Sequence, residues 1–437
     1  MTDTFRWHPK ARLFDSAGAE VNATVPLPQH ARQGGALLKA PDTIASGLVL
    51  PDSPHALAAA IGHPAFRIGA PDQPPPDPHD QPILETLTSG STGQPRRIRR
   101  TQASWTASFA VNSRFGIGPD ARAATLGRLI HSLSLYGAIE GLHLGAEVHL
   151  LADLRPDRQL AALRQRQITH LYATPAQLRL ILGPGTLPDL DLILIGGSKL
   201  DPALRAALTI LAPNAKLREF YGAAETSFIT LADETTPDTS VGRPYPGVDL
   251  HLDPSGEVWV RSPYLFLDYA IHIGANIPAR RARSEPVVRP SRTEARQKAC
   301  APALDSPPPA TRWRDGWLSV GEIGSLHNGF LTLNGRAGRM ITIADQNVFP
   351  EEIEALLLTL PGITQAAVVP VPDRKRGHVL VAVLQGDPSS EAAILARLRR
   401  DLGLLKSPKS LIWRDDWPTL PSGKTDLKAL EATLWPA

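Results

Sequence analysis

The chain has 437 residues, of which 42 % are hydrophobic and 20 % charged, so it can bury large cores and is neither disordered nor fibrous. The single cysteine, Cys300, excludes a disulfide framework and a multi-cysteine metal cluster, and it is typical of a cytoplasmic protein. The polar N-terminus lacks the apolar core of a signal peptide, and no run of about 18 apolar residues predicts a membrane span.

The net charge of +3 is concentrated in one segment. Residues 272–314 contain nine lysines and arginines and three acidic residues, which leaves a charge of −3 on the rest of the chain. This segment is rich in proline and alanine and lacks apolar periodicity, so we interpret it as a poorly ordered basic insertion. A nucleic-acid-binding or scaffold protein that uses this insertion is the alternative outside enzymes. Nucleic acid is disfavoured as a partner because no aromatic residue is interleaved with the arginines before Trp313.

The first part of the chain predicts an α/β domain. Residues 69–78 are rich in proline and predict a connector. After it, apolar runs alternate with helical patterns, which is typical of a mostly parallel sheet. The runs are 146–151, 168–173 and 190–195, and the helical patterns are 158–166 and 203–211. We assign residues 1–335 to this larger domain, with the insertion inside it.

The pattern after the insertion changes and predicts a compact α+β unit of ordinary domain size. We assign residues 336–437 to this smaller C-terminal domain. Helical periodicity covers 350–360 and 390–402, and apolar strand-like runs cover 366–371 and 379–384.

A loop of small and hydroxylated residues directly follows the apolar run 82–87. Its sequence is Thr88-Ser89-Gly90-Ser91-Thr92-Gly93-Gln94-Pro95-Arg96-Arg97. Glycines let backbone amides approach a phosphate chain, and hydroxyls add hydrogen-bond donors. The loop is not a Walker A motif, and Gly423-Lys424-Thr425 does not complete one, because Pro418 stands at the position of the required first glycine. The sequence therefore predicts a polyphosphate-binding loop of another kind.

Further motifs follow this loop in a fixed order. They are Tyr221-Gly-Ala-Ala-Glu-Thr226, Val241-Gly-Arg-Pro-Tyr-Pro-Gly247, Asp315-Gly-Trp-Leu-Ser-Val-Gly-Glu-Ile-Gly324, Gly335-Arg336, Asn347-Val-Phe-Pro-Glu-Glu-Ile-Glu354 and Pro421-Ser-Gly-Lys-Thr425. Together with the loop, this series resembles the adenylate-forming superfamily of acyl-CoA synthetases, peptide-synthetase adenylation domains and luciferases. The resemblance runs from about Leu84 to Leu430. It implies a large N-terminal α/β adenylation domain joined by a hinge to a smaller C-terminal α+β domain.

The resemblance assigns roles that the chemistry also requires, because attack on the α-phosphorus of ATP builds negative charge that cations and donors must stabilise. Glu225 would hold Mg²⁺, Thr226 would contact the α-phosphate, and Lys424 would neutralise charge during adenylation but not during thioester formation. Arg339 occupies the hinge position. The residues implied in ATP or AMP binding are Thr88, Ser89, Gly90, Ser91, Thr92, Gly93, Gly197, Ser198, Tyr221, Gly222, Glu322 and Arg336.

Residues 129–139 resemble an element that lines the acyl pocket, with His131 at its mouth. The resemblance places Gly196 in the same pocket. An α-amino acid is disfavoured because no aspartate lies between Ile130 and Glu140 to pair with an ammonium group. The closest resemblance is to stand-alone bacterial acyl-CoA ligases. It implies a fatty or other non-amino acid that is activated as acyl-AMP and passed to coenzyme A. The alternative is an aryl- or acyl-acid ligase that loads the phosphopantetheine of an acyl carrier protein, which the segment Gly196-Gly-Ser-Lys199 suggests. The sequence carries no signal of the oligomeric state.

Two positions depart from the family pattern. Arg97 replaces the glycine that usually ends the phosphate loop. Asp345 stands where relatives usually have a glycine beside the pantetheine arm of the thiol. Because aspartate adds bulk and negative charge near a phosphate-bearing acceptor, it predicts that thioester transfer is the slower half-reaction.

Overall fold

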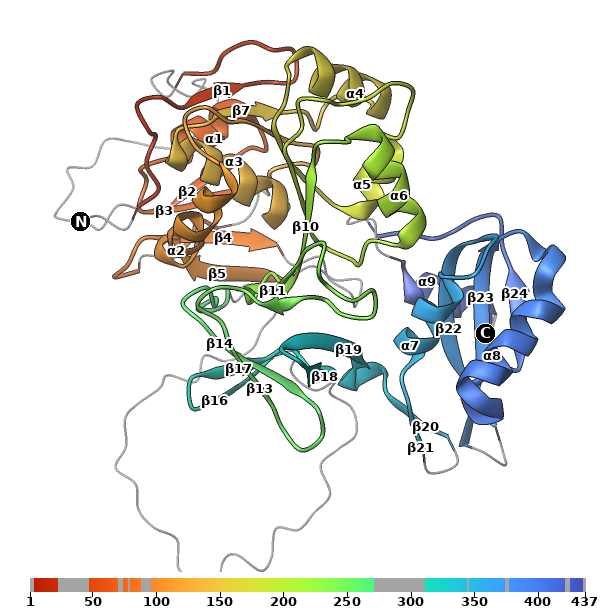
Figure 1. Ribbon diagram of the computed structural model, residues 1–437. Helices are drawn as coiled ribbons and strands as arrows, with labels where there is room; N and C mark the ends of the chain where they lie inside the picture. The colour runs from red at the N-terminus through yellow and green to blue at the C-terminus, as the bar shows by residue number, and fades with distance from the viewer. Residues whose placement is uncertain are drawn as a thin grey trace, which may run out of the picture.

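The computed structural model describes residues 4–22, 47–69, 74–77, 79–87, 96–270, 311–343, 346–373, 377–420 and 425–434. Figure 1 shows a large α/β part, drawn from red to green, and a smaller α+β part, drawn in blue. The predicted fold class is therefore confirmed. Among the described residues, no helix has both the length and the apolar character needed to cross a bilayer.

The central element of the large part is an eight-stranded sheet. Its first six strands run parallel to their neighbours, and the last two are antiparallel. In spatial order they are β1 (Arg12–Phe14), β7 (Glu147–Leu150), β6 (Arg122–Thr125), β8 (His170–Ala173), β9 (Leu192–Ile195), β10 (Lys216–Ala223), β11 (Ser227–Ala232) and β12 (Arg243–Pro244). The strands predicted from the three apolar runs are β7, β8 and β9.

Both faces of this sheet are covered by helices, and β9 shows why. Leu192 and Leu194 belong to one core cluster, whereas Ile193 and Ile195 belong to the other. Successive side chains of a strand point to opposite faces, so a strand buried on both sides is apolar throughout. The helices on the first face are α2 (Gln102–Asn112) and α3 (Ser132–Leu144), and those on the second are α4 (Pro156–Gln165), α5 (Pro175–Leu180) and α6 (Pro202–Leu211).

A second sheet carries a row of alternating charges. Its strands are β15 (Asp268–Tyr269), β5 (Arg97–Thr101), β4 (Ile83–Leu87), β3 (Ala65–Ile68) and β2 (Leu48–Leu50), and α1 (Pro54–Ala60) joins the last two. Arg67, Glu85, Arg99 and Asp268 are paired in register across four strands. Arg67 lies 3.1 Å from Glu85, and both are almost fully buried. Opposite charges directly across strands stabilise the pairing, so this row fixes the register of β4 and β5.

Our expectation for the last residues of the insertion was wrong. We expected residues 272–314 to be poorly ordered, but Arg312–Arg314 form β16, which pairs with β17 (Trp317–Ser319). Asp315 and Gly316 have φ of +48° and +79°, which is the backbone of a tight hairpin turn that Asp-Gly favours. The rest of that segment, up to residue 310, lies outside the described residues. Two further strands complete this sheet, β13 (Asp249–Leu252) and β14 (Val258–Arg261).

The C-terminal part follows a β-hairpin made by β18 (Glu322–His327) and β19 (Phe330–Arg336). Its elements are β20 (Ile341–Ile343), β21 (Gln346–Val348), α7 (Pro350–Leu357), β22 (Ile363–Asp373), β23 (Gly377–Gly386), α8 (Glu391–Lys406), β24 (Ser410–Trp413) and α9 (Leu427–Leu434). Short 3₁₀ helices cover Ser113–Phe115, Ala337–Arg339 and Pro388–Ser390. The predicted helices and strands of the α+β unit are thus present, with strands longer than expected.

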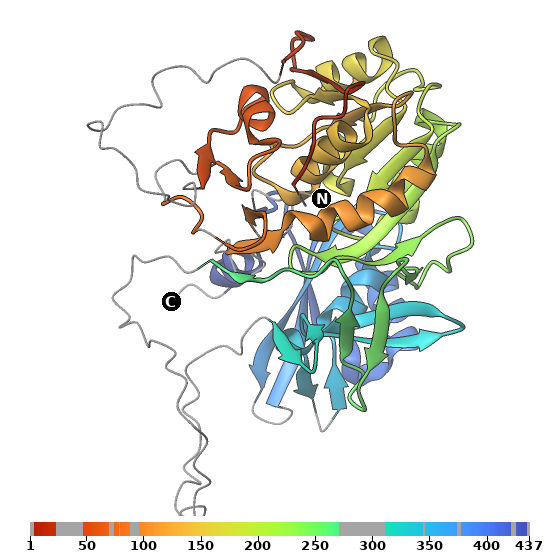
Figure 2. The same cartoon turned by 90° about the vertical axis from the view of Figure 1, so that its left-hand side faces the viewer.

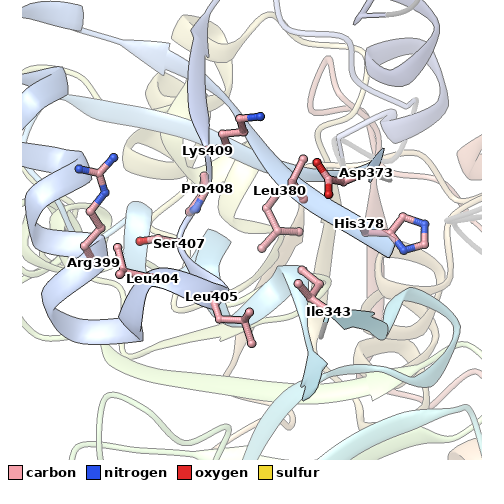
Figure 3. Close-up of a pocket in the computed structure, with 11 residues that line it drawn as sticks. Ile343, Asp373, His378, Leu380, Arg399, Leu404, Leu405, Ser407, Pro408 and Lys409 are labelled. Atoms are coloured by element: carbon pink, nitrogen blue, oxygen red, sulfur yellow. The ribbon is translucent and has the colours of Figure 1, made fainter. Parts of the chain in front are cut away.

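A cavity of about 390 Å³ lies in this part of the chain. Gly403, with φ 78° and ψ 168°, interrupts α8, so the last helical turn departs from the axis of the preceding ones. Figure 3 shows Leu380, Leu405 and Ile343 pointing toward one another, while the charged ends of Arg399 and Lys409 point away from them. The cavity therefore has an apolar floor.

Glu140 on α3 is a fully buried carboxyl group that ties α2, α3 and β8 together. Its oxygens accept hydrogen bonds from Asn112 at 2.9 Å, from Tyr136 at 3.0 Å and from Tyr172. Burial raises the pKa of Glu140 to about 8, although the three donors oppose the shift. The folded protein therefore keeps a proton between about pH 4.5 and pH 8 that the unfolded chain releases, so this group makes folding less stable as pH rises through that window.

We expect Glu140→Gln to stabilise the protein progressively as pH rises from about 5 to about 8, by about 1 kcal/mol per pH unit relative to wild type, because the amide has no proton to lose. Calorimetric unfolding of both proteins across that range measures the difference. Glu20→Gln is the matched control, since Glu20 lies at the surface in an ion pair with Arg12. A pH-independent difference for Glu140→Gln would contradict the assignment.

Candidate active site

Three of the predicted site segments lie at the carboxyl edge of the parallel sheet. Gly196, Gly197 and Ser198 follow β9 directly, Tyr221 and Gly222 end β10, and His131 follows β6 after a short loop. Because β6, β9 and β10 run in the same direction, their ends meet at one edge, which is where open α/β sheets bind ligands.

Glycines at this edge permit close approach of neighbouring groups. A Cβ atom on Gly196 would lie 2.1 Å from the Phe220 ring, and one on Gly222 would lie 1.7 Å from the carbonyl oxygen of Ser227. Gly222 also sits where the β10–β11 register shifts. Gly197 has φ +98°, in the left-handed region that favours glycine. A side chain would therefore require the Phe220 ring to move at Gly196, the backbone to move at Gly222 and a strained backbone at Gly197.

Glu225 lies in the turn between β10 and β11 and is held on several sides. Its side chain is 9 % exposed, and its Oε1 accepts a hydrogen bond from the Tyr269 hydroxyl at 2.8 Å. Nη2 of Arg96 lies 3.7 Å from the same oxygen. The Glu225 carbonyl accepts a hydrogen bond from the Phe266 amide at 2.8 Å. The carboxylate thus has a fixed place next to the end of the predicted phosphate loop.

Arg100 on β5 supports the same turn from the interior of the protein. Its guanidinium donates to the Ala224 carbonyl at 2.8 Å and to the Ser227 hydroxyl, and it lies over the Trp105 ring. Ser227 has φ +54°, which is uncommon for a residue with a side chain. Burial lowers the pKa of Arg100 to about 10, with the Glu225 charge opposing the shift, so the group stays charged at neutral pH.

The Thr226 side chain forms its hydrogen bonds within its own turn. The residue is fully buried, and its hydroxyl accepts a hydrogen bond from the Ala223 amide at 2.9 Å. The same hydroxyl lies 3.4 Å from the Ala223 carbonyl. In this arrangement Thr226 caps its own turn, and its side chain would have to rotate to contact a phosphate.

Glu322, Arg336 and Tyr221 come together although they are far apart in sequence. Glu322 and Arg336 are paired on β18 and β19, with Nε of Arg336 donating to Glu322 Oε1 at 2.9 Å. The Tyr221 hydroxyl is buried and has no hydrogen-bond partner among the described residues. Burial, followed by the nearby Glu322 charge, raises the pKa of Tyr221. The three residues form one polar cluster beside the sheet edge.

His131 lies at the base of the predicted phosphate loop. It forms an isolated parallel bridge with Leu87, the last residue of β4, and it precedes α3. The next residue, Ser132, donates to the Thr86 hydroxyl at 3.1 Å. Burial lowers the pKa of His131, so the imidazole is neutral at neutral pH.

Arg339 is half-buried and bonded to the C-terminal part. It donates to both carboxylate oxygens of Glu354, at 3.1 Å and 2.7 Å, and to the Val368 carbonyl at 3.1 Å. Glu351 lies 3.2 Å away. The predicted hinge residue therefore belongs structurally to α7 and β22.

Several predicted site residues lie outside the described residues. These are Thr88, Ser89, Gly90, Ser91, Thr92, Gly93, Lys424 and also Asp345. The residues on both sides of the phosphate loop are described, and Leu87 of β4 pairs with Arg97 of β5. Arg97, which departs from the family pattern, is buried in that strand.

Sequence reasoning predicted neither Arg100 nor Tyr269 as part of this site. Arg100 lies on β5 and Tyr269 on β15, which pairs with β5, whereas the Glu225 turn joins β10 and β11 of the other sheet. Packing between the two sheets therefore brings them together. Their sequence separations from Glu225 are large, and neither lies in a motif with a known spacing. The one available signal was the concentration of arginines at 96–100, because a buried arginine requires a partner.

The residues present fit Mg²⁺ that is bound together with a nucleotide. Among the described residues, no group of three or more His, Cys, Asp and Glu side chains could hold a metal ion by itself. Mg²⁺ in nucleotide sites takes one or two carboxylates and draws its other ligands from phosphates and water. Glu225, with Oε1 bonded to Tyr269, supplies one such carboxylate oxygen.

The fold is of the α/β class, and comparison with known proteins shows which enzyme family it belongs to. The family model described as AMP-binding enzyme matches residues 14–270, and that of the AMP-binding enzyme C-terminal domain matches residues 352–424. The chain belongs to the AMP-binding, or adenylate-forming, enzyme family.

Two curated relatives and one solved structure illustrate the similarity. An uncharacterized acyl-CoA ligase, YhfT of Bacillus subtilis, is 29 % identical over 79 % of this chain and 67 % of its own length. VraA of Staphylococcus haemolyticus, named a putative long chain fatty acid-CoA ligase, is 28 % identical over 77 % of this chain and 67 % of its own. ATP-bound MatB of Rhodopseudomonas palustris is 18 % identical with a TM-score of 0.69, covering 99 % of this chain and 96 % of that one, and it shows the shared fold.

We expect Gly222→Ala to lower the free energy of unfolding by about 1–3 kcal/mol, the usual cost of overpacking, because its Cβ atom would collide with the Ser227 carbonyl. Urea unfolding followed by tryptophan fluorescence measures this. Gly118→Ala is the control, since a Cβ atom there meets nothing within 4 Å. Equal stability of the two variants would show that the turn can shift freely.

Proposed function

We propose that this chain is an acid–thiol ligase that activates a carboxylic acid with ATP as acyl-AMP and transfers the acyl group to coenzyme A. Membership of the AMP-binding family carries the first half of this proposal. The names of YhfT and VraA support the second half, since both are described as CoA ligases.

In the first half-reaction, a carboxylate oxygen attacks the α-phosphorus of ATP, the bond to the bridging oxygen breaks, and pyrophosphate leaves. Negative charge accumulates on the phosphate oxygens, so fixed cations and donors lower the barrier. Glu225 would hold Mg²⁺ on the phosphates, and Lys424 would approach the α-phosphate. The Glu322–Arg336 pair beside Tyr221 would receive the nucleoside.

In the second half-reaction, the thiol sulfur attacks the acyl carbon and AMP leaves with the former carboxylate oxygen. Lys424 is not required at this stage. We place the domain boundary between residues 335 and 336 and the hinge at Arg339. The contacts of Arg339 with Glu351 and Glu354 support this placement, because they attach it to the smaller domain.

A fatty or other non-amino acid is the substrate class that we propose. Residues 129–139, which form the acyl-pocket element, contain no carboxylate that could pair with an ammonium group. The neighbouring α3 residues Leu133 and Leu135 are apolar, and Leu135 is part of the large core. This element therefore favours an uncharged acyl group.

Pyrophosphate exchange over a panel of fatty, aryl and amino acids, with thioester formation measured in the presence of CoA or of phosphopantetheinylated carrier protein, tests the proposal. We expect exchange that depends on a fatty or aryl acid and thioester formation with CoA. Acyl transfer to the carrier protein alone would assign the chain to carrier loading. Salt-sensitive binding of random-sequence nucleic acid without any exchange would favour the non-enzyme alternative.

We expect Lys424→Ala to lose at least about a hundredfold in pyrophosphate exchange, since a preorganised group at the developing charge is worth about 3–4 kcal/mol. The same variant should still transfer acyl from supplied acyl-AMP to the thiol. Rapid-quench measurement of the two half-reactions separates these effects. Equal losses in both would remove the proposed role of Lys424.

A further inference from the structure

Tyr269 lies at a junction between Glu225 and Arg96, the next-to-last residue of the predicted phosphate loop. Its hydroxyl donates to Glu225 Oε1 at 2.8 Å. The guanidinium carbon of Arg96 lies 4.3 Å from the centre of the Tyr269 ring, and Arg96 Nη2 lies 3.7 Å from the same Glu225 oxygen. One side chain therefore contacts both charged groups through different parts of its structure.

The position of Tyr269 is fixed by strand pairing. β15 is antiparallel to β5, with Tyr269 opposite Ile98, and Figure 2 shows this green strand beside the orange strands of the second sheet. The Leu267 amide donates to the Arg99 carbonyl at 2.9 Å, and the Ala270 amide donates to the Arg97 carbonyl at 3.0 Å. These backbone hydrogen bonds thus hold the Tyr269 hydroxyl beside Glu225.

This contact decides which carboxylate oxygen of Glu225 is available. The tyrosine hydroxyl occupies Oε1 and restricts the rotation of a flexible side chain before any ligand arrives, which reduces the cost of binding. Without the hydroxyl, Arg96 could take both oxygens in a forked ion pair, because a guanidinium matches a carboxylate in that way. A carboxylate engaged in such a pair is a poorer ligand for a metal ion.

The Tyr269 ring contacts the second charged group, the guanidinium of Arg96. A guanidinium above an aromatic face is attracted by the negative face of the ring, which holds Arg96 over Tyr269. The arginine side chain is 43 % exposed, and the ring covers one face of its guanidinium. The ring therefore restrains Arg96, a cation near the end of the predicted phosphate loop that also faces Glu225.

We propose that Tyr269 is a positioning residue for the binding of Mg²⁺–ATP: its hydroxyl leaves Glu225 Oε2 available to the metal, and its ring holds Arg96 beside the phosphates. This inference rests on the proposed function. It assigns the hydroxyl and the ring separate effects, which two substitutions can separate.

Isothermal titration calorimetry of the full-length protein with ATP, in Mg²⁺ or in EDTA, tests the assignment. Tyr269→Phe removes the hydroxyl and keeps the ring, so we expect about tenfold weaker binding of Mg²⁺–ATP, because the lost hydrogen bond is to a charged group. Metal-free ATP should bind within about twofold of wild type. Tyr269→Leu should in addition weaken metal-free ATP by about threefold, because Arg96 loses its platform.

Tyr264→Phe is the matched control, since the Tyr264 hydroxyl donates to the Pro246 carbonyl at 2.6 Å and not to Glu225. It should bind both forms of ATP like wild type. Equal binding of Mg²⁺–ATP by Tyr269→Phe and wild type would overturn the proposal. A parallel loss of both ATP forms in Tyr269→Phe would also overturn it, because that result indicates general structural damage.

The titration requires neither acid nor thiol, so it is separate from the test of the reaction. If wild type binds Mg²⁺–ATP but shows no acid-dependent exchange, the proposed reaction fails while the role of Tyr269 stands or falls by its own variants. If wild type does not bind Mg²⁺–ATP at all, both are wrong.

Discussion

The buried guanidinium of Arg100 is the constraint on which the site geometry depends. A charge that is 1 % exposed is stable only if its hydrogen bonds are satisfied inside the protein. Arg100 meets most of this requirement through its two terminal nitrogens, which donate to the Ala224 carbonyl and the Ser227 hydroxyl, whereas its buried Nε has no hydrogen-bond partner among the described residues. The turn that carries Glu225 is therefore bound to β5, and β5 is the strand that leaves the predicted phosphate loop. Arg100 thus links two segments that we propose act on one nucleotide.

The charge row on the opposite face of β5 complements this arrangement. Arg99 lies between Glu85 and Asp268, so β5 is held in register with β4 on one side and with β15 on the other. A slip of one residue would exchange the faces of Arg99 and Arg100 and would bury the wrong charge. Successive side chains of β5 point to opposite faces, so Arg99 fixes the register of the sheet and Arg100 holds the turn that carries Glu225.

Periodicity was sufficient to predict the layers of the fold. The apolar run that became β9 is buried on both faces, and the segments at 158–166 and 203–211 are helical, as the patterns indicated. The Asp315-Gly316 pair is typical of a hairpin turn, and this turn places β16 where we expected disorder. The ordered motifs identified the family. They also singled out Glu322 and Arg336, whose pairing only the structure shows. The contacts of Arg100 and Tyr269 with the Glu225 turn depend on which strands are neighbours, and no local pattern encodes that.

The central claim is that the acid is activated as an acyl-adenylate, and the fate of the carboxylate oxygen tests it most directly. The reaction is run with ATP, Mg²⁺, CoA and an acid whose carboxylate carries heavy oxygen, and the released nucleotide is analysed by mass spectrometry. The account predicts one heavy oxygen in the phosphate of AMP, because that oxygen attacks the α-phosphorus and stays with it when the thiol displaces AMP. Unlabelled AMP with the label in inorganic phosphate or pyrophosphate would contradict it.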